Sequence, residues 1–220
     1  MDFHFSVDDV FDSLFDETHP LVQFVNEMDV VHPVDLYCFY QDGEKTLCDI
    51  TNNHFNGHVE FNVHGLDRET PPYVQVPEEQ KSVFNDIYYE FQRIGYERSN
   101  QTRLHYFSES YELSDYFLQR GVDTLFTTDK DALLWRLPIE LKESMSEKGQ
   151  CNYQGLNFVR TSLRTENLVG LEPWEVADKL VELVTSNKPV CVMTHEYELM
   201  RPQVRELTKY VINFLKDMEI

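Results

Sequence analysis

Residues 157–194 read NFVRTSLRTENLVGLEPWEVADKLVELVTSNKPVCVMT. The stretch begins with one apolar run, 157–163, and ends with another, 189–194, and both have the length and composition of strands. Between them, Pro173 stands where a first helical residue is favoured, and Val176, Ala177, Leu180 and Val184 follow at helical spacing. This order predicts two parallel strands joined by a helix.

The same alternation fills the rest of the chain. Further strands are predicted at 2–7, 34–40, 59–64, 102–107 and 122–127. Helices are predicted after the capping residue Thr18, over 78–94 before Gly95, over 110–120 before Gly121, and over 202–218. Seven strands alternating with helices predict an α/β fold with a mostly parallel sheet, either open or closed into a barrel. Because the sequence contains no linker, repeat or low-complexity tract, we expect one domain over residues 1–220.

The charge of the chain excludes several classes of partner. The formal net charge is −20, from 19 Lys and Arg against 39 Asp and Glu. So acidic a protein repels the phosphate backbone of nucleic acids and the anionic surface of membranes. Neutral or cationic partners, such as uncharged sugars or amines, are therefore expected. Because 41% of the residues are hydrophobic, there is ample material for a core.

The cysteines and the N-terminal residues bear on the compartment. Cys38, Cys48, Cys151 and Cys191 form no CxxC pair, and we expect buried, reduced thiols. The N-terminus has no basic region followed by an apolar stretch, and no apolar run approaches the roughly 20 residues of a membrane span. We therefore expect a cytoplasmic protein.

Acidic residues and histidines stand where several predicted strands end. Asp8 and Asp9 follow the first strand, His64 ends the third, and His195 follows the last. Since the carboxyl ends of parallel strands meet at one edge, these side chains are expected to converge. On its own, a pair of adjacent acids is more typical of a solvated turn. A single histidine on its own is more typical of a structural contact. Together they predict a metal-assisted hydrolase.

At these positions the sequence resembles the polysaccharide deacetylases. The family's opening T-F-D-D motif is similar to Ser6-Val7-Asp8-Asp9, and its H-[ST]-x-x-H motif is similar to the stretch from His64 to Arg68. Its R-x-P-x-G motif retains only Arg103, and its closing L-x-H motif resembles Met193-Thr194-His195. Its D-x-x-D-W motif is weakly echoed by Asp129, Asp131 and Trp135.

The resemblance implies a fold, a cofactor and an activity. The fold would be a distorted (β/α) barrel of about seven strands. The activity would be removal of an acyl group from an N- or O-acylated sugar or related small amide, with a divalent metal, usually zinc. Asp8 would be the general base, Arg103 would orient it, and His195 would be the general acid. Asp9 and His64 would be metal ligands.

One departure from the family pattern concerns the metal. Arg68 stands where the second histidine of the H-[ST]-x-x-H motif is expected. Asp67 is our first candidate for the third ligand, and His105 on the neighbouring strand is another. In a further alternative, the Arg68 guanidinium takes the place of the metal and abolishes its binding. The chain would then be a non-catalytic relative that binds a glycan or a protein.

Three further residues are predicted to bind substrate. Arg164 and Glu166 lie just past the sixth strand, and Trp135 belongs to an aromatic cluster that can stack on a sugar ring. A solvated rim and ordinary core packing are the alternatives. A phosphate-handling barrel enzyme is disfavoured, because the sequence lacks a Gly-rich phosphate loop.

Overall fold

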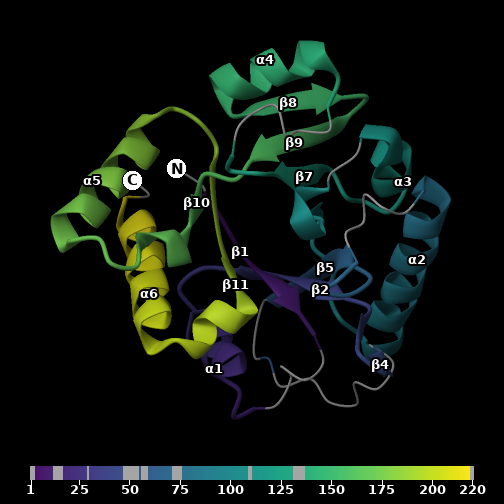
Figure 1. The fold of residues 1–220 in the computed structure, drawn as a ribbon, viewed down its shortest axis with the longest axis horizontal. Helices are drawn as coiled ribbons and strands as arrows, with labels where there is room; N and C mark the ends of the chain where they lie inside the picture. Colours follow the sequence, from purple (N-terminus) through teal and green to yellow (C-terminus); the bar gives the residue numbers. More distant parts are fainter. Residues whose placement is uncertain are drawn as a thin grey trace.

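The computed structural model describes residues 3–11, 17–28, 30–46, 55, 59–70, 76–108, 111–130 and 137–218. Within these ranges the chain forms an α/β fold (Figure 1). The strands are β1 (Phe3–Val10), β2 (Val34–Phe39), β3 (Gln41–Asp42), β4 (Lys45–Thr46), β5 (Val59–Gly65), β6 (Gln101–Thr102), β7 (Thr124–Thr127), β8 (Gln150–Tyr153), β9 (Leu156–Arg160), β10 (Leu163–Arg164) and β11 (Val190–His195). The α-helices are α1 (Pro20–Met28), α2 (Pro77–Ile94), α3 (Ser114–Leu118), α4 (Ile139–Lys148), α5 (Pro173–Thr185) and α6 (Pro202–Asp217).

Most strands belong to two sheets. The larger sheet has the order β10-β11-β1-β2-β5, and every pairing in it is parallel. The smaller has the order β6-β7-β9-β8, in which only β8 runs antiparallel to its neighbour. The short β3–β4 hairpin stands apart. The predicted α/β class with mostly parallel strands is confirmed.

The two sheets face a common interior. The Thr102 hydroxyl of β6 donates to the Val63 carbonyl of β5, while on the other side the chain passes directly from β9 into β10. Four strands, two from each sheet, contribute one buried residue each to a shared cluster: Tyr37, Phe126, Val159 and Cys191. Closure into one continuous barrel stays a prediction, because the described strands hydrogen-bond as two sheets.

Alternation along β1 separates this interior from the main hydrophobic core. Phe3, Phe5 and Val7 pack into that core, together with Leu21 and Val25 of α1 and other helical residues. The residues between them in β1, such as His4 and Ser6, contact polar groups of the interior. The helices lie outside the sheets, with α2 and α3 on one side and α5 and α6 on the other (Figure 1).

The helix boundaries follow the sequence at several positions. α2 ends at Gly95, whose φ of 76° is left-handed, and α5 begins at Pro173. The predicted strand 102–107 is wrong beyond Thr102, since residues 105–107 form a 3₁₀ turn instead. The predicted helix 110–120 is reduced to a 3₁₀ turn and the short α3. Within the described ranges, we find no helix both long and apolar enough to span a bilayer.

Candidate metal centre and active site

A bulge in β1 brings two consecutive carboxylates to one place. Between Val7 and Val10, β1 advances three residues while its partner β2 advances two, from Leu36 to Cys38. Asp9, the extra residue, has a φ of 62°, a left-handed conformation that Asp tolerates better than most residues. In a regular strand, neighbouring side chains point to opposite faces. The bulge breaks that alternation, so Asp8 and Asp9 both line the same pocket.

Asp8 forms a buried ion pair with Arg103. The Arg103 Nη1 donates to both carboxylate oxygens of Asp8, at 2.9 and 3.2 Å, and to the Ser6 hydroxyl at 2.8 Å. Both side chains are almost fully buried. Burial alone would lower the pKa of Arg103, but the Asp8 carboxylate, with contributions from Cys191 and Tyr37, raises it. The guanidinium therefore stays charged, and its hydrogen bonds hold the Asp8 carboxylate.

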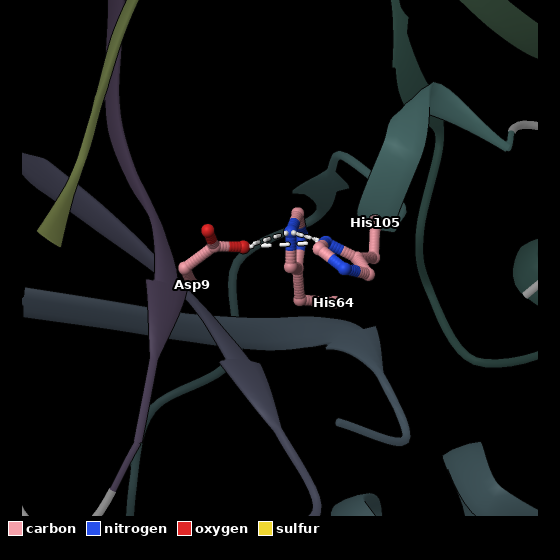
Figure 2. A group of neighbouring side chains, drawn as sticks. All are labelled: Asp9, His64 and His105. Carbon is pink, nitrogen blue, oxygen red and sulfur yellow. Dashed lines mark hydrogen bonds and ion pairs between the residues drawn. The ribbon is translucent and has the colours of Figure 1, made fainter. Parts of the chain in front are cut away.

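Three metal-ligating side chains meet beside this pair (Figure 2). His64 Nε2 lies 3.0 Å from Asp9 Oδ1, and His105 Nδ1 lies 3.3 Å from both of these atoms. They come from β1, from β5 and from the 3₁₀ turn after β6. All three residues are buried.

Each imidazole uses its second ring nitrogen to contact a backbone carbonyl, and this contact indicates which nitrogen carries the hydrogen. His64 Nδ1 lies 2.5 Å from the Arg103 carbonyl oxygen, and His105 Nε2 lies 2.9 Å from the Arg68 carbonyl oxygen. A carbonyl oxygen only accepts, so each of these nitrogens carries the hydrogen. In the neutral rings, His64 Nε2 and His105 Nδ1 are then unprotonated, and each directs a lone pair at Asp9. Backbone contacts of this kind commonly orient metal-ligating histidines.

The donor set fits a cation. Burial would raise the pKa of Asp9, but when both imidazoles carry a second proton, the hydrogen bonds that His105 and His64 donate hold that pKa well below its usual range. The carboxylate is therefore an anion facing two imidazole nitrogens. Three acceptor atoms so close together need a positive charge or shared protons between them. A divalent metal ion satisfies all three at once.

His195 lies at the end of β11, directly opposite Asp8 in the sheet register. Its Nδ1 donates to Glu166 Oε1 at 2.7 Å. Burial would lower the pKa of His195, but the hydrogen bond and charge of Glu166, together with the charges of Asp8 and Asp9, raise it. The geometry therefore places Glu166, expected to contact substrate, as the partner of His195.

Arg68 and Asp67 lie next to the triad but point to other partners. The Arg68 guanidinium pairs with Glu196, whose carboxyl pKa burial raises to about 8 although Arg68 opposes the shift. Asp67 accepts hydrogen bonds from the backbone N–H groups of Glu69 and Thr70 and thereby caps that turn. The side-chain group brought together within 4.8 Å is thus Asp9, His64 and His105, without Asp67.

Arg164 lies on the other side of the site. Its guanidinium pairs with Asp129 and stacks over the Phe107 ring at 4.6 Å from the centroid. Phe107 and its neighbour Tyr106 have left-handed φ values of 51° and 54°, which are strained for aromatic residues. Trp135 and Asp131 lie outside the described residues, so their predicted roles stay predictions.

Many of these groups line one pocket of about 660 Å³. Its lining includes the triad, Asp8, Arg103 and His195, together with Arg68, Arg164 and Lys130. A hollow of this size suits a sugar-sized ligand. The sequence located most of these groups, but the contact between Glu166 and His195 required the structure.

Comparison with known proteins identifies the fold that carries this site. No protein-family model matches the sequence, and no curated protein does. Among solved structures, a Mycobacterium smegmatis protein assigned as a polysaccharide deacetylase superposes with a TM-score of 0.62 at 10% identity, over 99% of this chain and 84% of the other. A family 4 carbohydrate esterase from Streptomyces lividans, in complex with acetate, gives 0.53 at 8% identity, over 96% and 88%.

A different enzyme shares the same architecture. The 4-α-glucanotransferase of Thermococcus litoralis superposes with a TM-score of 0.57 at 16% identity over 96% of this chain. This chain spans only 37% of the length of that enzyme. The likeness to deacetylases anticipated from the motifs is therefore confirmed for the fold, which the chain shares with carbohydrate-active enzymes. At such identities the shared fold alone does not define the chemistry.

Proposed function

We propose that this chain is a metal-dependent hydrolase that removes an acyl group from an N- or O-acylated sugar or a related small amide. The observation that carries the proposal is the meeting of Asp9, His64 and His105 beside the Asp8–Arg103 pair. The likeness to deacetylase structures agrees with it.

We infer that the metal is zinc, held by Asp9, His64 and His105. Two imidazoles and one carboxylate are a common set of protein ligands for catalytic zinc. Ligand atoms at about 2.0–2.1 Å from a tetrahedral zinc ion stand about 3.3 Å apart. The three ligand atoms here are separated by 3.0, 3.3 and 3.3 Å. When bound, such an ion polarises the acyl carbonyl and lowers the pKa of water in the site.

Asp8 would act as the general base. Its carboxylate accepts from Arg103 and Ser6, which fixes its orientation but leaves lone pairs for a further donor. A water molecule in the pocket can therefore pass its proton to Asp8 as it attacks the acyl carbon. Arg103 is a positioning residue, since it acts through Asp8.

His195 would act as the general acid. Its Nδ1 is occupied by Glu166, and Glu166 raises the pKa of the ring, so the protonated form persists to higher pH. The proton on Nε2 is then the one to pass to the departing amine or alcohol. Glu166 is in turn the group that keeps this ring oriented.

The test combines metal content with turnover. We would measure zinc by elemental analysis in the wild type and in Asp9→Ala, His64→Ala and His105→Ala, and follow acetate release from acetylated chito-oligosaccharides and acetylated monosaccharides. About one equivalent of zinc in the wild type, lost in all three variants, is expected. Asp8→Asn should keep the zinc and lose turnover.

Two outcomes would contradict the proposal. If the wild-type protein bound no zinc, cobalt or nickel, the proposed metal site would be refuted. If the Asp8→Asn variant were active, the assignment of Asp8 as general base would be refuted. Zinc binding with no turnover on any acylated substrate would instead favour the alternative of a non-catalytic protein that binds a glycan or a protein partner.

A further inference from the structure

The pocket inverts the charge balance of the chain. The protein as a whole has 39 acidic residues against 19 Lys and Arg. The pocket lining within the described ranges instead contains Arg68, Arg103, Lys130 and Arg164 against Asp8 and Asp9. Asp129, Glu166 and Glu196 pair with lining residues but do not line the pocket themselves, so the groups exposed to a ligand there are mainly cationic.

Three of these four cations form ion pairs with acids, and the third pair is that of Arg164 with Asp129. Arg103 pairs with Asp8, and Arg68 pairs with Glu196, whose side chain is only 2% exposed. Asp9 is engaged by the two histidines. Asp129 engages Nη2 of Arg164, so the cationic donors left for a ligand are Lys130 and the remaining N–H groups of Arg164.

Arg164 is held in a rigid setting. Its Nη2 donates to Asp129, its plane rests on Phe107, and its side chain is only 15% exposed. Within the described part of the chain, its buried Nε has no hydrogen-bond partner. A guanidinium fixed by one acid and one ring keeps further N–H groups in a planar fork, the shape that matches a carboxylate or phosphate.

Lys130 lines the same pocket as Arg164, and a second arginine holds its backbone. Arg160 Nη2 donates to the carbonyl groups of Asp129 and Lys130, at 2.7 and 3.3 Å, and the Lys130 N–H donates to the Thr128 hydroxyl. These contacts fix the turn after β7 from which Lys130 and Asp129 extend. Lys130 itself is exposed and lines the pocket.

We propose that Arg164 and Lys130 form an anion subsite, and that the preferred substrate is an acylated sugar carrying a carboxylate or phosphate group. This inference rests on the proposed function for the identity of the sugar, but anion binding by the subsite does not require turnover. The strongly negative protein would otherwise repel such a ligand, so the local cations define which sugars enter.

The experiment measures binding separately from hydrolysis. Metal-free protein is titrated calorimetrically with N-acetylglucosamine and with its 6-phosphate, at low and high NaCl. We expect the phosphate ester to bind about tenfold or more tightly than the neutral sugar, as a charge-assisted contact provides. The preference should shrink as salt screens it. N-acetylmuramic acid, which carries a carboxylate, distinguishes the two anions.

Substitutions locate the subsite. Arg164→Gln and Lys130→Gln should each reduce the preference for the charged sugar, and the double variant should abolish it. Lys148→Gln removes one positive charge from an exposed position of α4 outside the pocket, and it should leave the preference unchanged. Equal affinity for charged and neutral sugars, or a preference that survives in the double variant, would overturn the subsite. If the protein preferred the charged sugar but released no acetate, the anion subsite would be supported and the proposed hydrolysis would be refuted.

Discussion

The backbone of Arg103 holds His64 while its side chain holds Asp8. The Arg103 carbonyl accepts from His64 Nδ1 at 2.5 Å, and the guanidinium donates to the Asp8 carboxylate at 2.9 Å. One residue thus orients both a proposed metal ligand and the proposed base. Because only the second contact involves the side chain, the two roles can be separated by substitution.

Arg103→Met should therefore lose stability and turnover while keeping the metal. Removing the guanidinium leaves the buried Asp8 without its cation, which typically costs about 3–5 kcal/mol. Urea unfolding measures this loss, and elemental analysis measures the zinc. Arg201→Met is the matched control, because its half-exposed pair with Glu198 contributes at most about 1 kcal/mol. A loss below 1 kcal/mol in Arg103→Met would contradict the importance of the buried pair.

Zinc should stabilise the protein through His105 and not through Asp67. Saturation at about 100 times the dissociation constant adds about 2.7 kcal/mol, or a rise in Tm of about 5–10 °C. Scanning calorimetry with and without zinc should give this increment in the wild type and in Asp67→Ala, and chelation should reverse it. His105→Ala should show little increment, since two protein ligands hold zinc weakly. If Asp67→Ala lost the increment instead, the ligand set would have to be redrawn.

Glu166 should control the alkaline limb of the pH–rate profile. If protonated His195 is the acid, turnover falls as pH rises through its pKa. Glu166 raises that pKa, so Glu166→Gln should move the decline to lower pH. Glu198→Gln removes a nearby carboxylate that pairs with Arg201, and the profile should stay in place. If the pH–rate profile of Glu166→Gln were unchanged, the assignment of His195 as the general acid would be refuted.

Asp35 should make the protein less stable as pH rises. Burial raises the pKa of Asp35 to about 7, although the Ser99 hydroxyl that donates to it opposes the shift. Between pH 4 and 7, roughly, the folded state keeps a proton that the unfolded state has released, so stability falls across this window. Asp35→Asn cannot titrate, and its Tm should exceed that of the wild type more at pH 8 than at pH 5. A difference between the two proteins that stays constant with pH would disprove the assignment.

The sequence predicted those elements whose periodicity and end residues agree. The apolar stripe of 78–94 with Gly95, and the helix that starts at Pro173, correspond to α2 and α5. It did not predict α4, because only Met145 of that helix is buried and no apolar stripe develops. Nor did it predict β8, a four-residue antiparallel edge strand in which only Cys151 is buried.

The site was predicted where the strand ends define it and was missed where the chain leaves regular structure. The aromatic and β-branched composition of 102–107 favours a strand, yet Tyr106 and Phe107 take left-handed conformations that no local pattern indicates. That turn is what brings His105 to Asp9 and His64. The bulge at Asp9 is equally hidden, because its extra residue is defined only by pairing with β2.

His105 is held by the carbonyl oxygen of residue 68, a group that every amino acid has. The side chain at position 68 is therefore not needed to hold His105, and the Arg68 guanidinium pairs with Glu196 instead. A sequence pattern that requires a histidine at position 68 would not detect this chain, although the donor atoms of Asp9, His64 and His105 still lie close together. Candidate sites of this kind are better sought by the convergence of donor atoms in space than by the spacing of residues in a sequence motif.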